Sequence, residues 1–154
     1  MKLLRNHHCT AMAMMLVLIT HTAGAENATE NLDPRIRSLL QQEMRAIEGA
    51  MQSVLSAIVR GQHDVVEERG QAIHDSFILA QSLSEEDRRT LRAALPGGFV
   101  ELDKAFHGLA AELSESGTQE DSAAQLDVFQ QMTESCLQCH QTYAPDRFKG
   151  LSAR

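Results

Sequence analysis

Apolar residues recur at spacings of four and three along the segment from Pro34 to Arg60. This spacing is the period of an α-helix that buries one face. Asp33 and Pro34 supply an N-cap and a first-turn proline, and Gly61 supplies a stop. The pattern therefore predicts a helix over 34–60. Its inward positions are expected to be Ile36, Leu40, Met44, Ile47, Met51, Val54 and Ile58.

The same kind of spacing predicts three further helices. The second begins at about 63 and ends near 83, the third covers about 99–115 with Gly117 as its stop, and the fourth covers about 119–143. The residues expected to face inward are Val66, Ile73, Phe77 and Ala80 on the second, Phe99, Leu102, Phe106, Leu109 and Leu113 on the third, and Leu126, Phe129, Thr133, Cys136 and His140 on the fourth. No stretch shows the alternating pattern of a β-strand.

A short connecting helix over 84–95 is predicted between the second and third helices. Ser84 and Asp87 have the spacing of a capping box, and the Pro-Gly-Gly sequence at 96–98 breaks the chain. Four helices with mostly short links predict an all-α fold, an antiparallel up-down-up-down four-helix bundle. In that topology the end of the fourth helix lies beside the start of the first and third helices.

The first 25 residues have the features of a secretory signal peptide. They contain a basic start, an apolar run over 11–19 and an Ala-Gly-Ala cleavage signal at 23–25. The apolar run is shorter than the roughly 20 residues of a membrane-spanning helix. We therefore expect residues 1–25 to be removed and residues 26–154 to form one periplasmic domain.

Removal of this leader makes the chain more acidic. Without Lys2 and Arg5, the count of Lys plus Arg falls from 14 to 12 against 21 Asp plus Glu, a formal charge of −9. Such a charge argues against nucleic acid and anionic membranes as partners and favours basic proteins. Any association with a membrane is expected only through partner complexes.

The predicted fourth helix contains Cys136-Leu-Gln-Cys139-His140, a CxxCH motif that is typical of covalent haem c attachment. Two thiols at this spacing can add to the two vinyl groups on one porphyrin edge, and the adjacent imidazole can bind the iron. A zinc site would need another ligand pair, but Cys9 is lost with the leader and no further cysteine remains. A redox dithiol belongs at a strand-to-helix junction. We therefore expect haem c.

The signal peptide, the four-helix pattern and CxxCH on the last helix together resemble the class II cytochromes c, the cytochrome c prime family and its low-spin relatives. The resemblance covers nearly the whole mature chain and depends on where the motif lies, because most small class I cytochromes c carry CxxCH near the N-terminus. It implies that Cys136 and Cys139 carry the haem, that His140 is the proximal iron ligand and that the distal residue comes from the first helix. It also leaves a homodimer possible.

The residue on the other side of the iron determines what the haem does. A rise of about 1.5 Å per helical residue places Met44, His107 and His74 at a suitable depth in the bundle. Met44 lies centrally in the inward stripe, whereas each histidine follows a core residue and lies on the flank of its helix. Met44 is therefore the leading candidate for the distal ligand, and His107, His74 and an open site are the alternatives.

These features predict an electron-transfer protein with one haem that passes single electrons between redox partner proteins. Catalysis by the chain alone is not expected, because the sequence contains no Ser/His/Asp arrangement, no glycine-rich phosphate loop and no second metal motif. One alternative is a five-coordinate haem protein that binds nitric oxide or carbon monoxide. The other is the haem subunit of a larger oxidoreductase.

Overall fold

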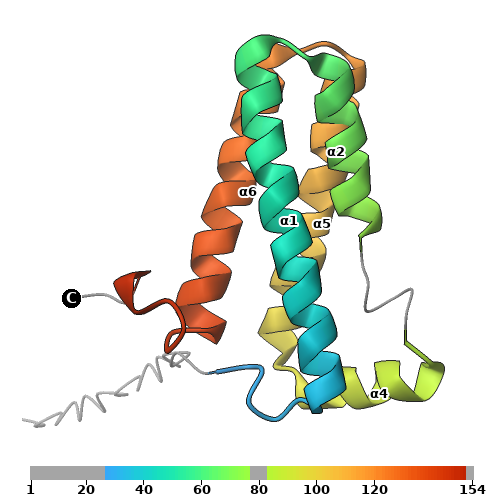
Figure 1. The fold of residues 1–154 in the computed structure, drawn as a ribbon, viewed down its shortest axis with the longest axis vertical. Coiled ribbons are helices and arrows are strands. Elements are labelled where there is room, and N and C mark those ends of the chain that lie inside the picture. The colour runs from blue at the N-terminus through green and yellow to red at the C-terminus, as the bar shows by residue number, and fades with distance from the viewer. Residues whose placement is uncertain (1–26, 77–82, 152–154) are drawn as a thin grey trace, which may run out of the picture.

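The computed structural model describes residues 27–76 and 83–151, and within these ranges the protein is all-helical, as predicted. The helices are α1 (Pro34–Arg60), α2 (His63–Asp75), α4 (Glu85–Ala94), α5 (Gly97–Thr118) and α6 (Ser122–Tyr143), followed by the 3-10 turn η1 (Lys149–Leu151). Helices α1, α2, α5 and α6 run along the long axis of the molecule and pack as a bundle, and α4 lies across one end (Figure 1). In the two described ranges, no helix is long and apolar enough to cross a bilayer. The predicted leader lies outside the described residues.

Helix α1 begins and ends where the sequence predicts. Its N-cap Asp33 accepts a hydrogen bond from the Arg35 N–H at 2.9 Å, and Gly61 adopts a left-handed φ of 67° after the last turn. The predicted inward face is correct except at one position. Met44 is 37% exposed, and its neighbour Glu43 is buried instead.

Helix α2 is shorter than predicted, since it ends at Asp75 and not near Leu83. The backbone N–H and the hydroxyl of Ser76 both donate to the Ile73 carbonyl, at 3.1 and 2.8 Å, and this closes the last turn. The predicted inward residues at 77 and 80 lie outside the described residues. The connecting helix α4 has the predicted capping box, in which Ser84 and Asp87 each bind the other's backbone N–H.

Gly117 does not end the third predicted helix, because α5 continues through it to Thr118. A Cβ at this position would come within 2.5 Å of the Glu67 backbone nitrogen on α2, and a Cβ at Gly70 would come within 2.6 Å of the Ser114 nitrogen. The two glycines therefore permit a close approach of α2 to α5. Tertiary packing, not helix termination, explains the glycine at 117.

Alanine at Gly117 is expected to lower the free energy of unfolding by about 1–3 kcal/mol, because the added methyl group would overpack the contact with the α2 backbone. Urea unfolding followed by circular dichroism measures this change. Gly108 is the matched control on the same helix, since a Cβ there meets no atom within 4 Å. Gly108→Ala is expected to raise stability by up to about 1 kcal/mol. Equal effects of the two substitutions would contradict the packing explanation.

The buried face of α6 differs in part from the predicted one, because Phe129 and Cys136 pack against the core as predicted but two other predicted positions are exposed. Gln125, Val128 and Met132 are buried, whereas Leu126 is 56% exposed and Thr133 is exposed. The Gln125 amide is fully inside the bundle because it has polar partners there, the carbonyl of Ser116 at 3.0 Å and the ring nitrogen Nδ1 of His63 at 2.9 Å. A hydropathy pattern predicts that this glutamine is exposed and therefore misplaces the centre of the buried face.

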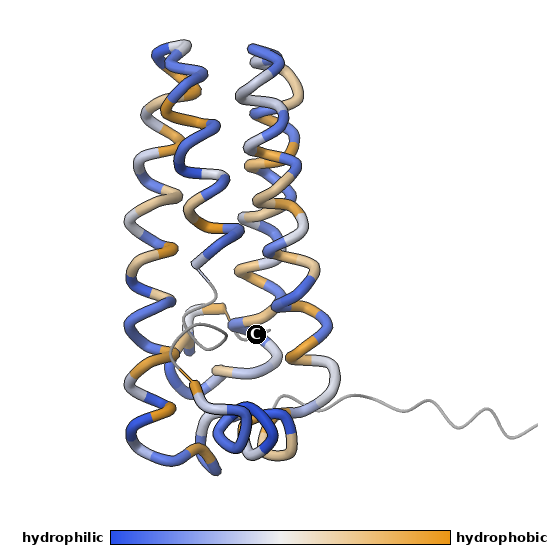
Figure 2. Tube along the Cα trace, turned by 90° about the vertical axis from the view of Figure 1, so that its right-hand side faces the viewer, coloured by the Kyte–Doolittle hydropathy of each residue, from blue (hydrophilic) through white to orange (hydrophobic). Residues whose placement is uncertain are grey.

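The buried side chains form two apolar clusters, and apolar segments alternate with polar ones along the bundle helices (Figure 2). The first cluster, between α1, α2, α5 and α6, comprises Ile47, Val54, Ala57, Val66, Ile73, Phe106, Ala110, Leu113, Val128 and Met132. The second, at the α4 end, comprises Ala28, Leu32, Ile36, Leu40, Leu83, Leu91, Leu95 and Phe99. Tyr143 at the end of α6 contacts this second cluster, since its ring packs edge-on against Phe99 and its carbonyl accepts the Ala28 N–H at 3.0 Å.

Candidate functional site

The three motif residues lie on the last turns of α6 and line one pocket. Positions three and four apart share a helix face, so Cys136, Cys139 and His140 project to the same side. The remaining lining residues come from α1, α5 and the same turn of α6, and they are Met44, Ile47, Leu102, Asp103, Phe106 and Ser135. The structure thus brings the motif together with Met44, and neither His74 nor His107 lines this pocket.

The two cysteines are free thiols in a largely apolar setting. Cys136 packs against the first cluster and Cys139 against the second. Burial raises the pKa of both thiols, and the nearby negative charges of Asp103 and Cys136 help to raise the pKa of Cys139 to about 11. Reactive dithiols have a lowered pKa, so these surroundings do not favour a thioredoxin-like redox site.

The His140 imidazole stacks on the ring of Phe148, with centroids 4.0 Å apart and planes within 5° of parallel. The chain reverses after α6, where the Phe148 N–H donates to the Ala144 carbonyl at 3.1 Å. The Gln141 amide holds the following turn by donating to the Leu151 carbonyl at 3.1 Å. Sequence reasoning missed Phe148, whose only signal is that it is the single aromatic residue in the tail after α6.

The electrostatics around His140 favour its neutral form. Burial lowers the pKa of this imidazole, and the positive charge of Arg147 lowers it further, against an opposing effect of Glu48. Metals bind neutral imidazole. At neutral pH the histidine of the motif therefore has an unprotonated ring nitrogen whose lone pair can bind a metal.

The two alternative histidines make other contacts. The Nδ1 atom of His107 donates to the Ile73 carbonyl at 2.9 Å, and the Nδ1 atom of His74 donates to the His107 carbonyl at 2.9 Å. The Nε2 atom of His107 lies 4.0 Å from a Glu43 carboxylate oxygen and 3.9 Å from one of Asp103. The sequence places His107 on the flank of its helix, whereas the structure buries this residue. Both histidines link α2 to α5.

The residues of the pocket fit a covalently attached haem, whereas its volume does not yet admit one. Two thiols, an imidazole and the Met44 thioether converge on it, with apolar walls from Ile47, Leu102 and Phe106. The cavity is about 50 Å³, well below the roughly 300–1,000 Å³ of cofactor pockets. Helix α6 has a larger interface with α5 than with α1, so a haem in this pocket would require α1 and α6 to lie further apart.

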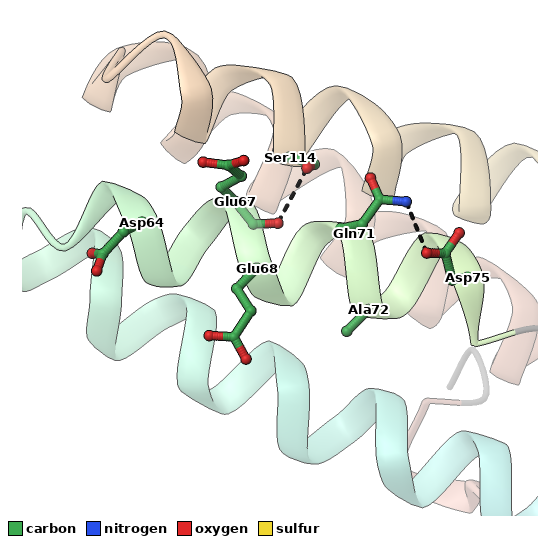
Figure 3. Close-up of a pocket in the computed structure, with 7 residues that line it drawn as sticks. All are labelled: Asp64, Glu67, Glu68, Gln71, Ala72, Asp75 and Ser114. Atoms are coloured by element: carbon green, nitrogen blue, oxygen red, sulfur yellow. Dashed lines mark hydrogen bonds between the residues drawn. The ribbon is translucent and has the colours of Figure 1, made fainter.

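A larger cavity of about 540 Å³ lies elsewhere, along α2 (Figure 3). Its lining residues are Asp64, Glu67, Glu68, Gln71, Ala72, Asp75 and Ser114. The Ser114 hydroxyl donates to the Glu67 carbonyl, and the Gln71 amide donates to Asp75. This cavity shares no residue with the motif pocket and its lining contains neither a thiol nor an imidazole, so it does not compete as a haem site.

Comparisons of this chain with family models, with curated proteins and with solved structures gave no match.

Proposed function

We propose that this protein is a c-type cytochrome that holds one haem and transfers single electrons between redox partner proteins. The observation that carries the proposal is the convergence of both motif thiols and His140 on one pocket that Met44 also lines. Cys136 and Cys139 form the two thioether bonds in this proposal. His140 is the proximal iron ligand and Met44 is the distal ligand.

A bound haem iron with imidazole and thioether ligands supplies a one-electron couple, and the thioether raises its reduction potential. The chain supplies the anchors, the axial donors and the apolar walls. Ile47, Leu102 and Phe106 exclude water from the pocket, and a site of low polarity favours the less charged, reduced state of the iron.

The antiparallel up-down-up-down order of α1, α2, α5 and α6, with α6 as the haem-attachment helix, is part of the proposal. His63 at the start of α2 contacts Gln125 near the start of α6, which supports a common direction for these two helices. Tyr143 at the end of α6 contacts Phe99 at the start of α5 and Ala28 before α1. These contacts support the same direction for α1 and α5, opposite to that of α6.

Periplasmic placement follows from the features of residues 1–25, and c-type haem is attached outside the bacterial cytoplasm. The acidic charge of the mature chain supports basic redox proteins as partners, without nucleic acid and with membranes reached only through partner complexes. A homodimer is compatible with the proposal.

Absorption spectra of the purified protein, produced with a functional haem-maturation system, test the function. We expect one haem that survives denaturation, a low-spin spectrum in both oxidation states and slow carbon monoxide binding, because an internal ligand must first be displaced. Absence of any haem band would contradict the whole proposal. A high-spin spectrum with rapid carbon monoxide uptake would instead identify the five-coordinate, gas-binding alternative.

A further inference from the structure

The carboxylate of Glu43 is buried inside the bundle, although hydropathy predicts an exposed residue. Glu43 is 1% exposed and lies on α1 between the buried residues Leu40 and Ile47, at the helical spacing of the inward stripe. Its Oε1 atom is 4.0 Å from Nε2 of His107 on α5. A buried carboxylate is unfavourable without polar partners, and the His107 imidazole supplies one from α5.

His107 is itself held against α2 by two hydrogen bonds. Its Nδ1 donates to the Ile73 carbonyl of α2, and its own carbonyl accepts the His74 Nδ1 hydrogen bond, both at 2.9 Å. Asp103, one turn earlier on α5, lies 3.9 Å from the same Nε2 that faces Glu43. The imidazole is therefore fixed relative to α2 and α5, and the Glu43 side chain of α1 lies beside it.

The rotation of α1 determines where Met44 points. An α-helix has about 3.6 residues per turn, so consecutive side chains are separated by about 100° around the axis. With Glu43 directed toward α5, Met44 is turned away from the buried stripe. This explains why Met44 is 37% exposed and nevertheless lines the pocket of Cys136 and His140.

We propose that Glu43 and His107 are a positioning pair that sets the rotation of α1 and so presents the Met44 sulfur to the iron site. This inference rests on the proposed function, because it requires Met44 as the distal ligand. Glu43 itself does not touch the iron. Its role is to keep its neighbour in the direction from which the thioether can bind.

The test compares variants of the haem-loaded protein by their ferric spectra, well below the unfolding temperature. Glu43→Leu keeps a side chain of similar size but removes the contact with His107, and we expect it to lose at least half of the sulfur-to-iron charge-transfer absorbance. Glu43→Gln retains a polar group of the same shape and is expected to keep the wild-type absorbance. Val54→Ala, on the same helix and fully buried, is the control for simple destabilisation, and it should keep the absorbance.

His107→Phe provides a second, independent variant, because it keeps an aromatic ring but removes both nitrogens. It should lose the absorbance as Glu43→Leu does, and it decides the question if Glu43→Leu does not fold. Met44→Ala distinguishes a failure of the positioning role of Glu43 and His107 from a failure of Met44 as the ligand. If Met44→Ala loses the absorbance while folded Glu43→Leu and His107→Phe retain it, the positioning role alone is overturned. If Met44→Ala retains the wild-type spectrum, Met44 is not the ligand and the positioning role falls with it.

Discussion

A variant with serine at both Cys136 and Cys139 is expected to carry no covalently bound haem, whereas the unaltered protein is expected to retain a haem through denaturation. Thioether formation requires sulfur nucleophiles, and a serine hydroxyl does not replace them. Haem staining of denaturing gels, together with the intact mass of the protein, measures the loss. Each single substitution leaves one thiol and is expected to give partial attachment.

The fold is expected to persist in this double variant, because serine is close in size to cysteine and both positions are only half-buried. Circular dichroism checks that the helical content is unchanged. Leu137→Ala is the matched control, since Leu137 lies between the two cysteines and is 43% exposed. It should keep full attachment. Covalent haem in the double variant would show that other residues carry the cofactor.

Met44→Ala is expected to convert the low-spin ferric spectrum completely to a high-spin or water-ligated one, to lower the reduction potential and to accelerate carbon monoxide binding. The physical reason is the loss of the thioether donor that lines the pocket with His140. Absorption spectroscopy, redox titration and flash photolysis measure these three changes. Because Met44 is 37% exposed, the cost in stability should be below the ~2–5 kcal/mol of a fully buried methionine.

Met51→Ala is the control for this substitution. Met51 lies two helical turns further along α1, packs against the first cluster and does not line the pocket. Its replacement should leave the spectrum of the wild type. An unchanged spectrum in Met44→Ala would exclude Met44, and the same measurement on variants of His107 and His74 would then test the alternatives.

Local signals explain why α1 was predictable from the sequence. Asp33 and Gly61 encode its two ends within a few residues, and most of its apolar stripe is buried as the spacing indicates. The face of α6 was not predictable in this way. The burial of Gln125 depends on Ser116 and His63, which a hydropathy pattern along one helix does not contain.

The candidate site was predictable to a similar extent. The spacing of Cys136, Cys139 and His140 places them together because one helix face carries all three. Met44 lines the same pocket and its ligand role stays a prediction, but its expected place in the centre of the buried stripe was wrong. Glu43 occupies that place. Its spacing from Leu40 and Ile47 indicates a buried position, but its charge led to the prediction that it is exposed.

The two motif cysteines lie at the boundary between the two halves of the core. Cys136 packs with the residues around Phe106, and Cys139 packs with those around Phe99. A rigid group bonded to both sulfurs is anchored in both halves at once. If the cofactor is attached, this double anchorage should make separate unfolding of either half more difficult, so the two clusters would unfold more cooperatively.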